Sequence, residues 1–270
     1  MKRSTRPLMQ MATPGPLRVV GGHLVVFRRL WQLNLLSSFV QPMLYLLGLG
    51  VGVGALVDRN TGSTQTLGGM SYVAFVAPGL IATTAMAVCA AESMWPVMGG
   101  LKWRRDYHGI AATPLDATDI VVGHMIWMAM RAGITGLAVA AALVFVDDTR
   151  GWGLLPAVLV AMIVGVSFAM PIMAYSVGAE MDGGFPAIQR FVIIPLFLFG
   201  GAFYPLAQLP EVVQWFARSF PLWHGVVVAR GFTTGSVDWV GVAGHLAYMV
   251  LWAVVGTAVS VTRLSRRLYP

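Results

Sequence analysis

The sequence predicts an all-α integral membrane protein with six transmembrane helices, and three observations support that fold class. Of 270 residues, 57% are hydrophobic and only 11% are charged, whereas an ordinary soluble domain carries about 25% charged residues. Several apolar runs reach the roughly 20 residues that a helix needs to cross a bilayer. These runs are continuous rather than alternating, which favours helices over the strands of a membrane barrel.

The chain 1–270 forms one predicted transmembrane domain. Its six spans cover about Leu33–Val57, Tyr72–Ala91, Ile120–Val146, Trp152–Gly178, Ala187–Tyr204 and Trp239–Thr262. With the N-terminus inside, thirteen Lys/Arg lie on the cytoplasmic side: Lys2, Arg3, Arg6, Arg18, Arg28, Arg29, Lys102, Arg104, Arg105, Arg190, Arg263, Arg266 and Arg267. Four lie outside: Arg59, Arg150, Arg218 and Arg230. This bias predicts a multi-pass protein of the cell membrane with both termini cytoplasmic.

The segment 1–31 precedes the first span. Within it, Val19, Leu24, Phe27 and Trp31 can share one helical face, with Arg18 and Arg28 off that face. Such a helix can lie in the lipid headgroup plane. The alternative interpretation is an ordinary basic flank.

Several chemistries are absent from the sequence. Neither lysine, Lys2 nor Lys102, fits the pattern GxxxxGK[ST] of a phosphate-binding loop, so any ATP and Mg must be bound by a separate subunit. The net charge of +7 reflects membrane topology rather than a nucleic-acid partner. No metal, cofactor or catalytic residue is predicted. Four glycines inside the first span instead indicate close helix packing in GxxxG pairs: Gly48, Gly50, Gly52 and Gly54.

The histidines and the serines show no catalytic pattern. Ser167 and His245 lie at different predicted depths, which argues against an intramembrane serine protease. His124 and His245 each lack a partner at matching depth, which argues against a haem-binding pair. Both are therefore expected to be packing or interface histidines.

The longest cytoplasmic connection is the segment 93–119. Its charged and aromatic middle is followed by Thr113-Pro114, a helix stop, and by Asp116 near a helix start. A short helix across the membrane plane would give an ATPase something rigid to push. An ordinary solvated loop is the alternative.

The segment 205–232 is apolar but too interrupted to cross the membrane. Pro205, Pro210 and Pro221 prevent one continuous helix. Because backbone at membrane depth must be shielded by protein or face a cavity, the segment is expected to cap the outer end of a translocation path.

Arg131 is the single charge predicted to lie fully within a span. Such charges are costly and are usually paired or functional. Glu92, at the inner end of the second span, is the candidate partner. The alternative is that Arg131 extends its side chain to the cytoplasmic headgroups.

Two blocks of the chain resemble ABC type-2 exporter permeases. The first is Arg105-Asp106-Tyr107 followed by Thr113-Pro114-Leu115, and the second comprises Gly200–Leu206, Leu209-Pro210, Phe220–His224 and Arg230-Gly231. Tyr72–Leu80 is similar to the second-span entry of the branch that holds drug-resistance and nodulation lipooligosaccharide permeases. The resemblance covers essentially the whole chain.

The resemblance implies an assembly of two permeases, identical or paralogous, with two ABC ATPase subunits that bind ATP and Mg. It implies that a coupling helix docks the ATPase, through Arg104, Arg105, Asp106, Tyr107, Thr113, Pro114 and Leu115. It implies outer re-entrant helices that form a gate, with Tyr204, Pro205, Pro210, Pro221 and His224.

The expected function is ATP-driven export of an amphiphile, such as a drug or a lipid-linked glycan, by alternating access. A secondary transporter or channel is the first alternative, although it would need more intramembrane polar residues than Arg131. A scaffold or assembly protein that transports nothing is the second.

Overall fold

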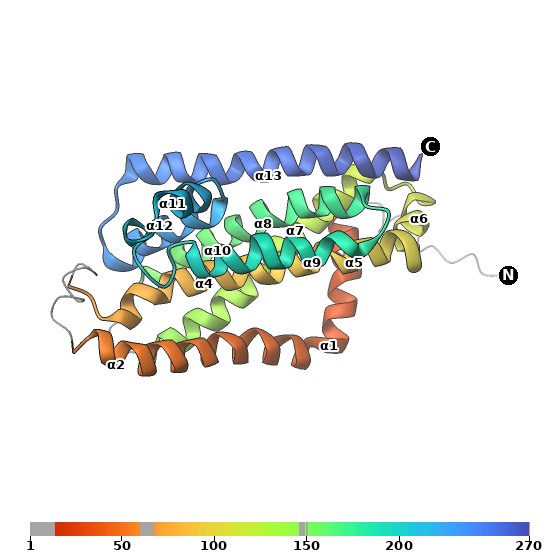
Figure 1. Ribbon diagram of the computed structural model, residues 1–270. Coiled ribbons are helices and arrows are strands. Elements are labelled where there is room, and N and C mark those ends of the chain that lie inside the picture. Colours follow the sequence, from red (N-terminus) through yellow and green to blue (C-terminus); the bar gives the residue numbers. More distant parts are fainter. Residues whose placement is uncertain (1–13, 60–66, 68, 146–148, 150, 270) are drawn as a thin grey trace.

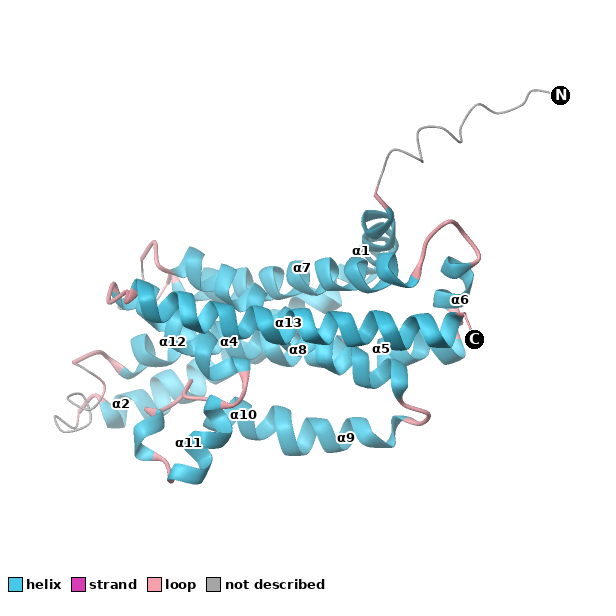
Figure 2. Cartoon of the chain, turned by 90° about the horizontal axis from the view of Figure 1, so that it is seen from above, coloured by secondary structure: helices cyan, strands magenta, loops and turns pink. Residues whose placement is uncertain are grey.

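The fold is all-helical throughout the part of the chain that the computed structural model describes, which is residues 14–59, 67, 69–145, 149 and 151–269. Figure 2 draws no strand in those residues. The first part of the chain forms α1 (Gly15–Tyr45), the π-helical η2 (Leu46–Val53), α2 (Gly54–Val57), α4 (Tyr72–Glu92), α5 (Trp95–Met98), η3 (Gly99–Trp103), α6 (Asp106–Ala111) and α7 (Ala117–Leu143). The second part forms α8 (Leu154–Gly178), η5 (Asp182–Gly184), α9 (Phe185–Ile188), η6 (Gln189–Ile193), α10 (Ile194–Phe199), η7 (Leu206–Gln208), α11 (Glu211–Arg218), α12 (Pro221–Thr234) and α13 (Trp239–Leu268).

Five of these helical stretches are long and apolar enough to cross a membrane: Tyr72–Trp103, Ala117–Leu143, Leu154–Gly178, Asp182–Phe199 and Trp239–Leu268. They match the predicted second to sixth spans. The predicted first span falls on α1, η2 and α2, where the apolar helix Pro42–Val57 is shorter. The side chains of residues 33–39 lie outside the described set, so the count of six spans stays a prediction.

Polar residues start three of the apolar helices. Ser71 accepts a hydrogen bond from the amide of Ala74 at the start of α4. Asp116 and Asp119 form a reciprocal capping box at the start of α7, and Asp238 accepts from the amide of Val240 at the start of α13. Each cap satisfies donors that the first helical turn leaves free. The predicted acidic helix start after Pro114 is therefore a true N-cap.

The helix α8 lies at the centre of the bundle and contacts α4, α7, α12 and α13. Large apolar side chains are fully buried around it, including Ile81, Met86, Met170 and Met173. Figure 1 shows α4, α7, α8 and α13 running side by side, with α6 and the C-terminus at one end and α11 and α12 at the other. We call these the α6 end and the α11 end.

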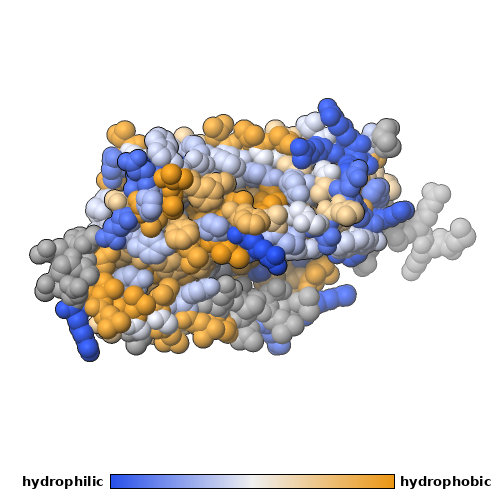
Figure 3. All heavy atoms as spheres, viewed as in Figure 1, coloured by the Kyte–Doolittle hydropathy of each residue, from blue (hydrophilic) through white to orange (hydrophobic). Residues whose placement is uncertain are grey.

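Two of the long helices form the outside of the bundle. Only 17% of the most apolar part of α13 is buried inside the protein, and the same fraction is buried in the stretch 182–199. Their exposed residues include Val240, Val254 and Phe191. Figure 3 shows hydrophobic residues over much of the middle of one face and many hydrophilic residues near the α6 end. A contiguous apolar surface of this kind suits contact with lipid.

The N-terminal helix α1 packs on the protein as well as presenting an exposed face. Its start runs across the ends of the other helices, and its later part, with η2 and α2, runs alongside them (Figure 1). His23 stacks on Trp127 with ring centroids 5.5 Å apart, and Phe27 meets the same ring edge-on. Trp31 remains 49% exposed. The predicted amphipathic face therefore contacts α7 at one end and lies open at the other; residues 1–13 of the segment 1–31 lie outside the described chain.

The fifth apolar helix ends earlier than its pattern predicts. We expected it to reach Tyr204, but α10 ends at Phe199. Gly200 and Gly201 follow, and Gly201 has a φ of +81°, a left-handed conformation that suits glycine. The turn therefore comes from the glycines and not from Pro205.

The contact between α8 and α13 provides a test of the packing. A Cβ at Gly256 would lie 2.5 Å from the backbone nitrogen of Pro171, whereas a Cβ at Gly244, on the same helix, would meet nothing within 4 Å. We predict that Gly256→Ala lowers the free energy of unfolding by about 1–3 kcal/mol because the helices must separate. Gly244→Ala should be neutral or stabilising by up to about 1 kcal/mol, since alanine favours helix. Unfolding in mixed micelles would measure both, and equal effects would contradict the packing described here.

Candidate functional site

The α6 end carries a compact projection made of residues 104–115, which we call the knob. The Nε of Arg104 donates to Oδ2 of Asp106 over 2.7 Å, and the hydroxyl of Thr113 donates to the carbonyl of Ile110 over 2.6 Å. Tyr107 is buried, and burial raises the pKa of its hydroxyl. The knob is thus tied to itself and to the core by short contacts, unlike an ordinary solvated loop.

Most of the residues predicted to couple to an ATPase lie on the surface of this knob. The exposed ones are Arg104, Arg105, Asp106, Thr113 and Pro114, whereas Leu115 is half-buried. Arg105 has a φ of +54°, which is uncommon for a residue other than glycine. The neighbouring Trp103 is 64% exposed. The surface therefore combines arginine and tryptophan, residue types that dominate many protein interfaces.

The knob is continuous with the long helix α4. After Glu92 the chain bends at Ser93–Met94 and continues as α5 and η3 to Trp103. Pro96 explains the bend, because it lacks an amide hydrogen and its ring interferes with the preceding turn. Met94 and Met98 on this stretch are fully buried. The first half of the segment 93–119 is therefore a buried helical extension, and only its second half projects.

Glu92 and Arg131 form an ion pair between α4 and α7. Both the Nε and the Nη2 of Arg131 lie 2.6 Å from Oε1 of Glu92, and the guanidinium lies 5.2 Å from the ring centroid of Phe27. The side chain of Arg131 is 5% exposed, so it is held inside the protein and does not extend to the headgroups. Removing one partner of such a buried pair costs about 3–5 kcal/mol.

A cavity of about 740 Å³, with a mainly apolar lining and several polar side chains, adjoins this ion pair at the α6 end. Side chains from α1, α4, α5, α6 and α7 line it, and they include His23, Glu92, His124 and Arg131. Nε2 of His124 lies 3.2 Å from the hydroxyl of Ser93. Ser93 is not a haem ligand, and this hydrogen bond gives His124 a packing role between α7 and the end of α4.

At the α11 end, the segment 205–232 forms three short helices, η7, α11 and α12, none of which is long enough to cross the membrane. Pro205 precedes η7, Pro210 precedes α11, and Pro221 occupies the first position of α12. Leu209 and Phe220, which precede two of these prolines, have extended backbones, as expected for residues before proline. Two of the three prolines therefore lie at helix starts that follow an extended residue, at α11 and α12, whereas the chain has already left the helix before Pro205. Tyr204 lies half-buried in the turn that leads into η7.

Arg230 attaches these short helices to α4. Its Nη2 donates to the carbonyl of Gly201 over 2.8 Å and to that of Phe75 over 3.2 Å, and its guanidinium lies 3.8 Å from the Phe75 ring centroid. Burial lowers the pKa of Arg230 to about 10, so the group stays charged near neutral pH. The sequence predicts Arg230 only as an outer topology charge, but in the structure it bonds two carbonyls of neighbouring elements.

A histidine pair attaches α12 to α13. Nδ1 of His224 lies 2.7 Å from Nδ1 of His245, and Nε2 of His224 lies 2.9 Å from the carbonyl of Arg218. Tyr248 stacks near His224 and donates its hydroxyl to the carbonyl of Ser219. The expectation that His245 has no partner at its depth is wrong, because the short helix α12 lowers His224 to the same level.

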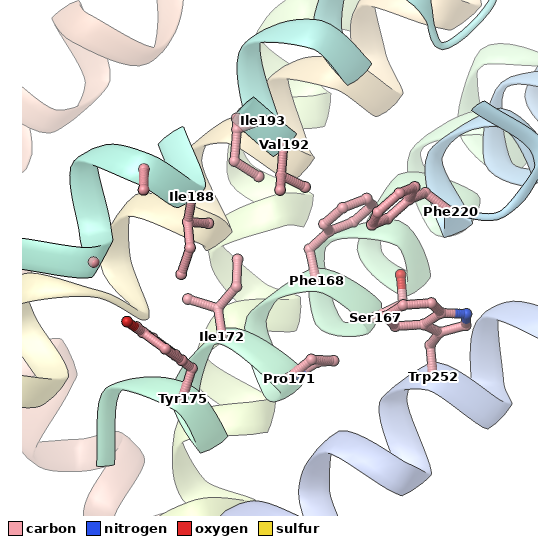
Figure 4. A pocket seen from close by; sticks show the side chains of 12 residues that line it. Ser167, Phe168, Pro171, Ile172, Tyr175, Ile188, Val192, Ile193, Phe220 and Trp252 are labelled. Atoms are coloured by element: carbon pink, nitrogen blue, oxygen red, sulfur yellow. The ribbon is translucent and has the colours of Figure 1, made fainter. Parts of the chain in front are cut away.

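Ser167 lies in a second, mainly apolar pocket of about 360 Å³. Figure 4 shows side chains from neighbouring helices converging on it, including Phe168, Ile188, Phe220 and Trp252. The hydroxyl of Ser167 donates to the carbonyl of Val164 over 2.7 Å. Ser167 is thus a serine satisfied by its own helix, without a histidine base beside it.

The predicted glycine packing has a mixed result. A Cβ at Gly54 would lie 3.7 Å from the ring of Tyr72, but Cβ atoms at Gly48 and Gly52 would meet nothing within 4 Å of the described chain. The surroundings of Gly50 lie outside the described part of the chain. The helix-packing role of the GxxxG pairs stays a prediction.

The sequence identified the knob and the proline breaks but not the contacts that hold them. The missed residues are Ser93, Arg230 and the partner of His245. Arg230 had a usable signal, because a lone arginine follows the apolar run Gly225–Ala229 within α12. The depth of His224 had none, since it depends on where a short helix lies in the membrane.

The histidine pair predicts a pH-dependent contact. Burial is the main cause that lowers the pKa of His224; the Arg218 carbonyl raises it, and His245 lowers it further. Because the lowered pKa favours the neutral form in the folded state, the contact is complete above the ordinary histidine pKa of about 6.5 and weakens as the pH falls below it. Two protonated imidazoles cannot share one hydrogen bond.

Amide hydrogen exchange of α12, corrected for intrinsic exchange rates, would measure how strongly this contact protects the helix. It would be recorded at about pH 7.5 and about pH 5.5, on either side of the ordinary histidine pKa of about 6.5. Exchange should be faster at the lower pH in the unmodified chain and independent of pH in His224→Phe/His245→Phe, which removes both titrating groups of the contact. Equal protection of the unmodified chain at both pH values would contradict the prediction.

Comparison with known proteins agrees with this architecture. Residues 19–233 match the ABC-2 type transporter family model. Nodulation protein J of Rhizobium leguminosarum bv. trifolii is 33% identical over 235 residues, covering 87% of each chain. Nodulation protein J of Rhizobium meliloti (strain 1021) is 32% identical over 237 residues, covering 88% of this chain and 87% of the relative. The inner membrane transport permease YadH of Escherichia coli (strain K12) is 23% identical over 240 residues, covering 85% and 90%. No solved structure matches. The family match spans most of the chain, and this protein therefore belongs to the ABC-2 type transporter family, as a multi-pass membrane permease.

Proposed function

We propose that this permease is the membrane subunit of an ATP-driven exporter and moves an amphiphile out of the cytoplasm. The observation that carries the proposal is the knob, a rigid projection that presents arginine and tryptophan at the α6 end while the chain has no phosphate-binding motif of its own. A separate ABC ATPase, present in two copies, binds ATP and Mg and docks on the knob. In this arrangement both termini lie in the cytoplasm.

The helix α4 would transmit movement of the knob across the membrane. It is linked to the knob through α5 and η3, and its other end contacts the short helices at the α11 end. There, a Cβ at Gly79 would lie 2.6 Å from Ala202, and Phe75 accepts hydrogen bonds from Arg230. A displacement at one end of α4 therefore has a direct mechanical route to the other. Opening at the α11 end would complete alternating access.

Two permeases complete the assembly. A single copy leaves Gly48, Gly52 and the neighbouring Leu47, which is 61% exposed, without a partner in the described chain. Small residues in this spacing let helices approach closely in lipid. We assign this face to a second permease, identical or paralogous.

The substrate would be an amphiphile. The pocket in Figure 4 is mainly apolar and lies on the outer side of α8, beside the exposed helices α9 and α13. Apolar walls of this kind accept an acyl chain or an aromatic drug by burial of apolar surface. Its 360 Å³ volume is at the lower end of the range typical of small-molecule sites.

A secondary transporter is the competing function, and the Glu92–Arg131 pair with His124 nearby favours it, because such groups can carry protons. Reconstitution with the ATPase separates the two. ATP-driven export that persists without a proton gradient supports the proposal. Export that requires the gradient and no ATPase overturns it.

The knob gives a sharper test. We predict that Arg105→Glu weakens binding of the ATPase and lowers ATP-driven export about tenfold, the effect of roughly 1.4 kcal/mol of lost interface energy. Arg266→Glu, an exposed arginine on α13 near the same end, is the matched control and should bind normally. Co-purification and export by vesicles would measure both. Normal binding and export by Arg105→Glu would show that the knob does not couple the ATPase.

A further inference from the structure

The apolar pocket in Figure 4 lies between two outward-facing walls, α13 and the stretch 182–199, which are both largely exposed. Figure 4 shows Phe220 and Trp252 at one side of the pocket and Tyr175 at the other. Tyr175 lies in the last turns of α8 and is 40% exposed. The pocket therefore reaches the outside of the bundle on its side nearer to the α6 end.

An arginine of α13 lies where the pocket approaches the α6 end. Nη1 of Arg263 donates to the carbonyl of Ala174 over 3.0 Å, and a Cβ at Gly178 would lie 2.9 Å from the same nitrogen. Trp252 and Arg263 are separated by about three helical turns, so they share one face of α13. We call the strip from Trp252 through Tyr175 to Arg263 the α13 groove. It has an apolar end and a cationic end.

Two further cations meet the end of α8 beside Arg263. Nη2 of Arg267 donates to the carbonyl of Gly178 over 2.9 Å, and Nζ of Lys102 in η3 donates to the carbonyl of Glu180. Capping of the free carbonyls of α8 explains these contacts in part. A guanidinium has five donors, however, and each arginine uses one in the described chain. Both arginines are exposed, so the other donors are open to a ligand.

The positive charge of this site is not neutralised by carboxylates. Within the described residues, ion pairs join Arg104 to Asp106 and Arg131 to Glu92, and neither pair includes Lys102, Arg263 or Arg267. Glu180 and Asp182 are exposed on the neighbouring loop and form no ion pair with these three cations. Uncompensated cations at the end of a membrane helix attract the phosphate groups of anionic lipids.

The length of the α13 groove fits a membrane lipid. Along the axis of α13, Trp252 and Arg263 are about 16 Å apart, at a rise of about 1.5 Å for each residue. One leaflet supplies about 15 Å of hydrocarbon, half of the roughly 30 Å core. A phosphate at Arg263 therefore lets an acyl chain reach the level of Trp252. A free phosphate would leave the apolar end empty, and a choline head group would bring a cation toward the arginines.

We propose that an anionic phospholipid of the bilayer occupies the α13 groove, with its phosphate on Arg263 and Arg267 and one acyl chain in the pocket of Figure 4. This inference goes beyond the proposed function, because binding of the lipid requires neither the ATPase nor export. An exported amphiphile that uses the same pocket would have to displace the acyl chain of this lipid.

Native mass spectrometry of the permease alone in detergent measures the binding of single lipids. Dioleoylphosphatidylglycerol and dioleoylphosphatidylcholine have the same acyl chains and differ in head-group charge, whereas inorganic phosphate supplies charge without a chain. We expect one phosphatidylglycerol to bind saturably and at least about tenfold more tightly than phosphatidylcholine, and inorganic phosphate not to displace it. Equal affinity for the two lipids, or displacement by phosphate, overturns the proposal.

Variants of the cationic end test the assignment. In Arg263→Gln/Arg267→Gln, the amides can still donate to the α8 carbonyls while both charges are lost. Phosphatidylglycerol should bind about tenfold more weakly and phosphatidylcholine as before. Arg28→Gln/Arg29→Gln, which removes two exposed charges from α1, is the matched control and should bind both lipids normally. Lys102→Gln, on a different element, should cause a smaller loss. Equal losses in the two double variants indicate diffuse attraction and overturn the proposal, as does unchanged binding in Arg263→Gln/Arg267→Gln.

A variant of the apolar end tests the place of the acyl chain. Ala187 lines the pocket and is exposed, so Ala187→Phe should fill the groove and weaken phosphatidylglycerol binding at least about fivefold, as loss of buried apolar surface implies. Ala258→Phe, at an exposed position of α13 outside the pocket lining, should bind normally. Normal binding by Ala187→Phe overturns the proposal. A permease dimer that binds no lipid and is weakened by Ala187→Phe would assign the groove to a second copy instead.

Discussion

The hydrogen bonds from Arg230 to the carbonyls of Gly201 and Phe75 hold the α11 end together. Lipid offers no partners to backbone groups, so a broken helix at membrane depth persists only where protein satisfies it. Here one guanidinium joins the turn after α10 to the first turn of α4, and its position over the Phe75 ring offsets part of its desolvation. Apolar packing of α12 on α8 and the His224–His245 contact with α13 add to this attachment, but among the described contacts Arg230 is the one that satisfies the Gly201 carbonyl in the turn after α10.

The helix α4 accepts hydrogen bonds from Arg230 at one end and leads to the knob at the other. It therefore connects the two ends of the bundle. At the end that leads to the knob, α4 contacts α7 through Glu92 and Arg131, and Ser176 of α8 donates to the carbonyl of Ser93 just after α4. Both contacts join it to the static core of the bundle. Movement of the knob must therefore either tilt α4 with its neighbours or change the bend at Ser93–Met94.

Local sequence rules predicted much of this molecule. The length of each apolar run predicted the second to sixth spans, and the prolines predicted the starts of α11 and α12. Both signals are local, because each depends only on residues within the element itself. Pairing across helices was harder: Glu92 and Arg131 could be matched by depth, but the His224–His245 contact depends on how far α12 descends. The predicted end of the fifth apolar helix was also wrong, because the helix ends before Gly200-Gly201 and does not continue to Tyr204-Pro205.

The most direct measurement of the central claim asks whether ATP at the α6 end changes exposure at the α11 end. Leu206 is 7% exposed and Val212 is 80% exposed, so Leu206→Cys and Val212→Cys, each in a Cys89→Ala background, report on a closed and an open position. Vesicles that hold the ATPase inside are labelled outside with an impermeant maleimide. The account predicts that ATP accelerates labelling at position 206 and leaves position 212 unchanged. Labelling at position 206 that is the same with and without ATP would contradict it.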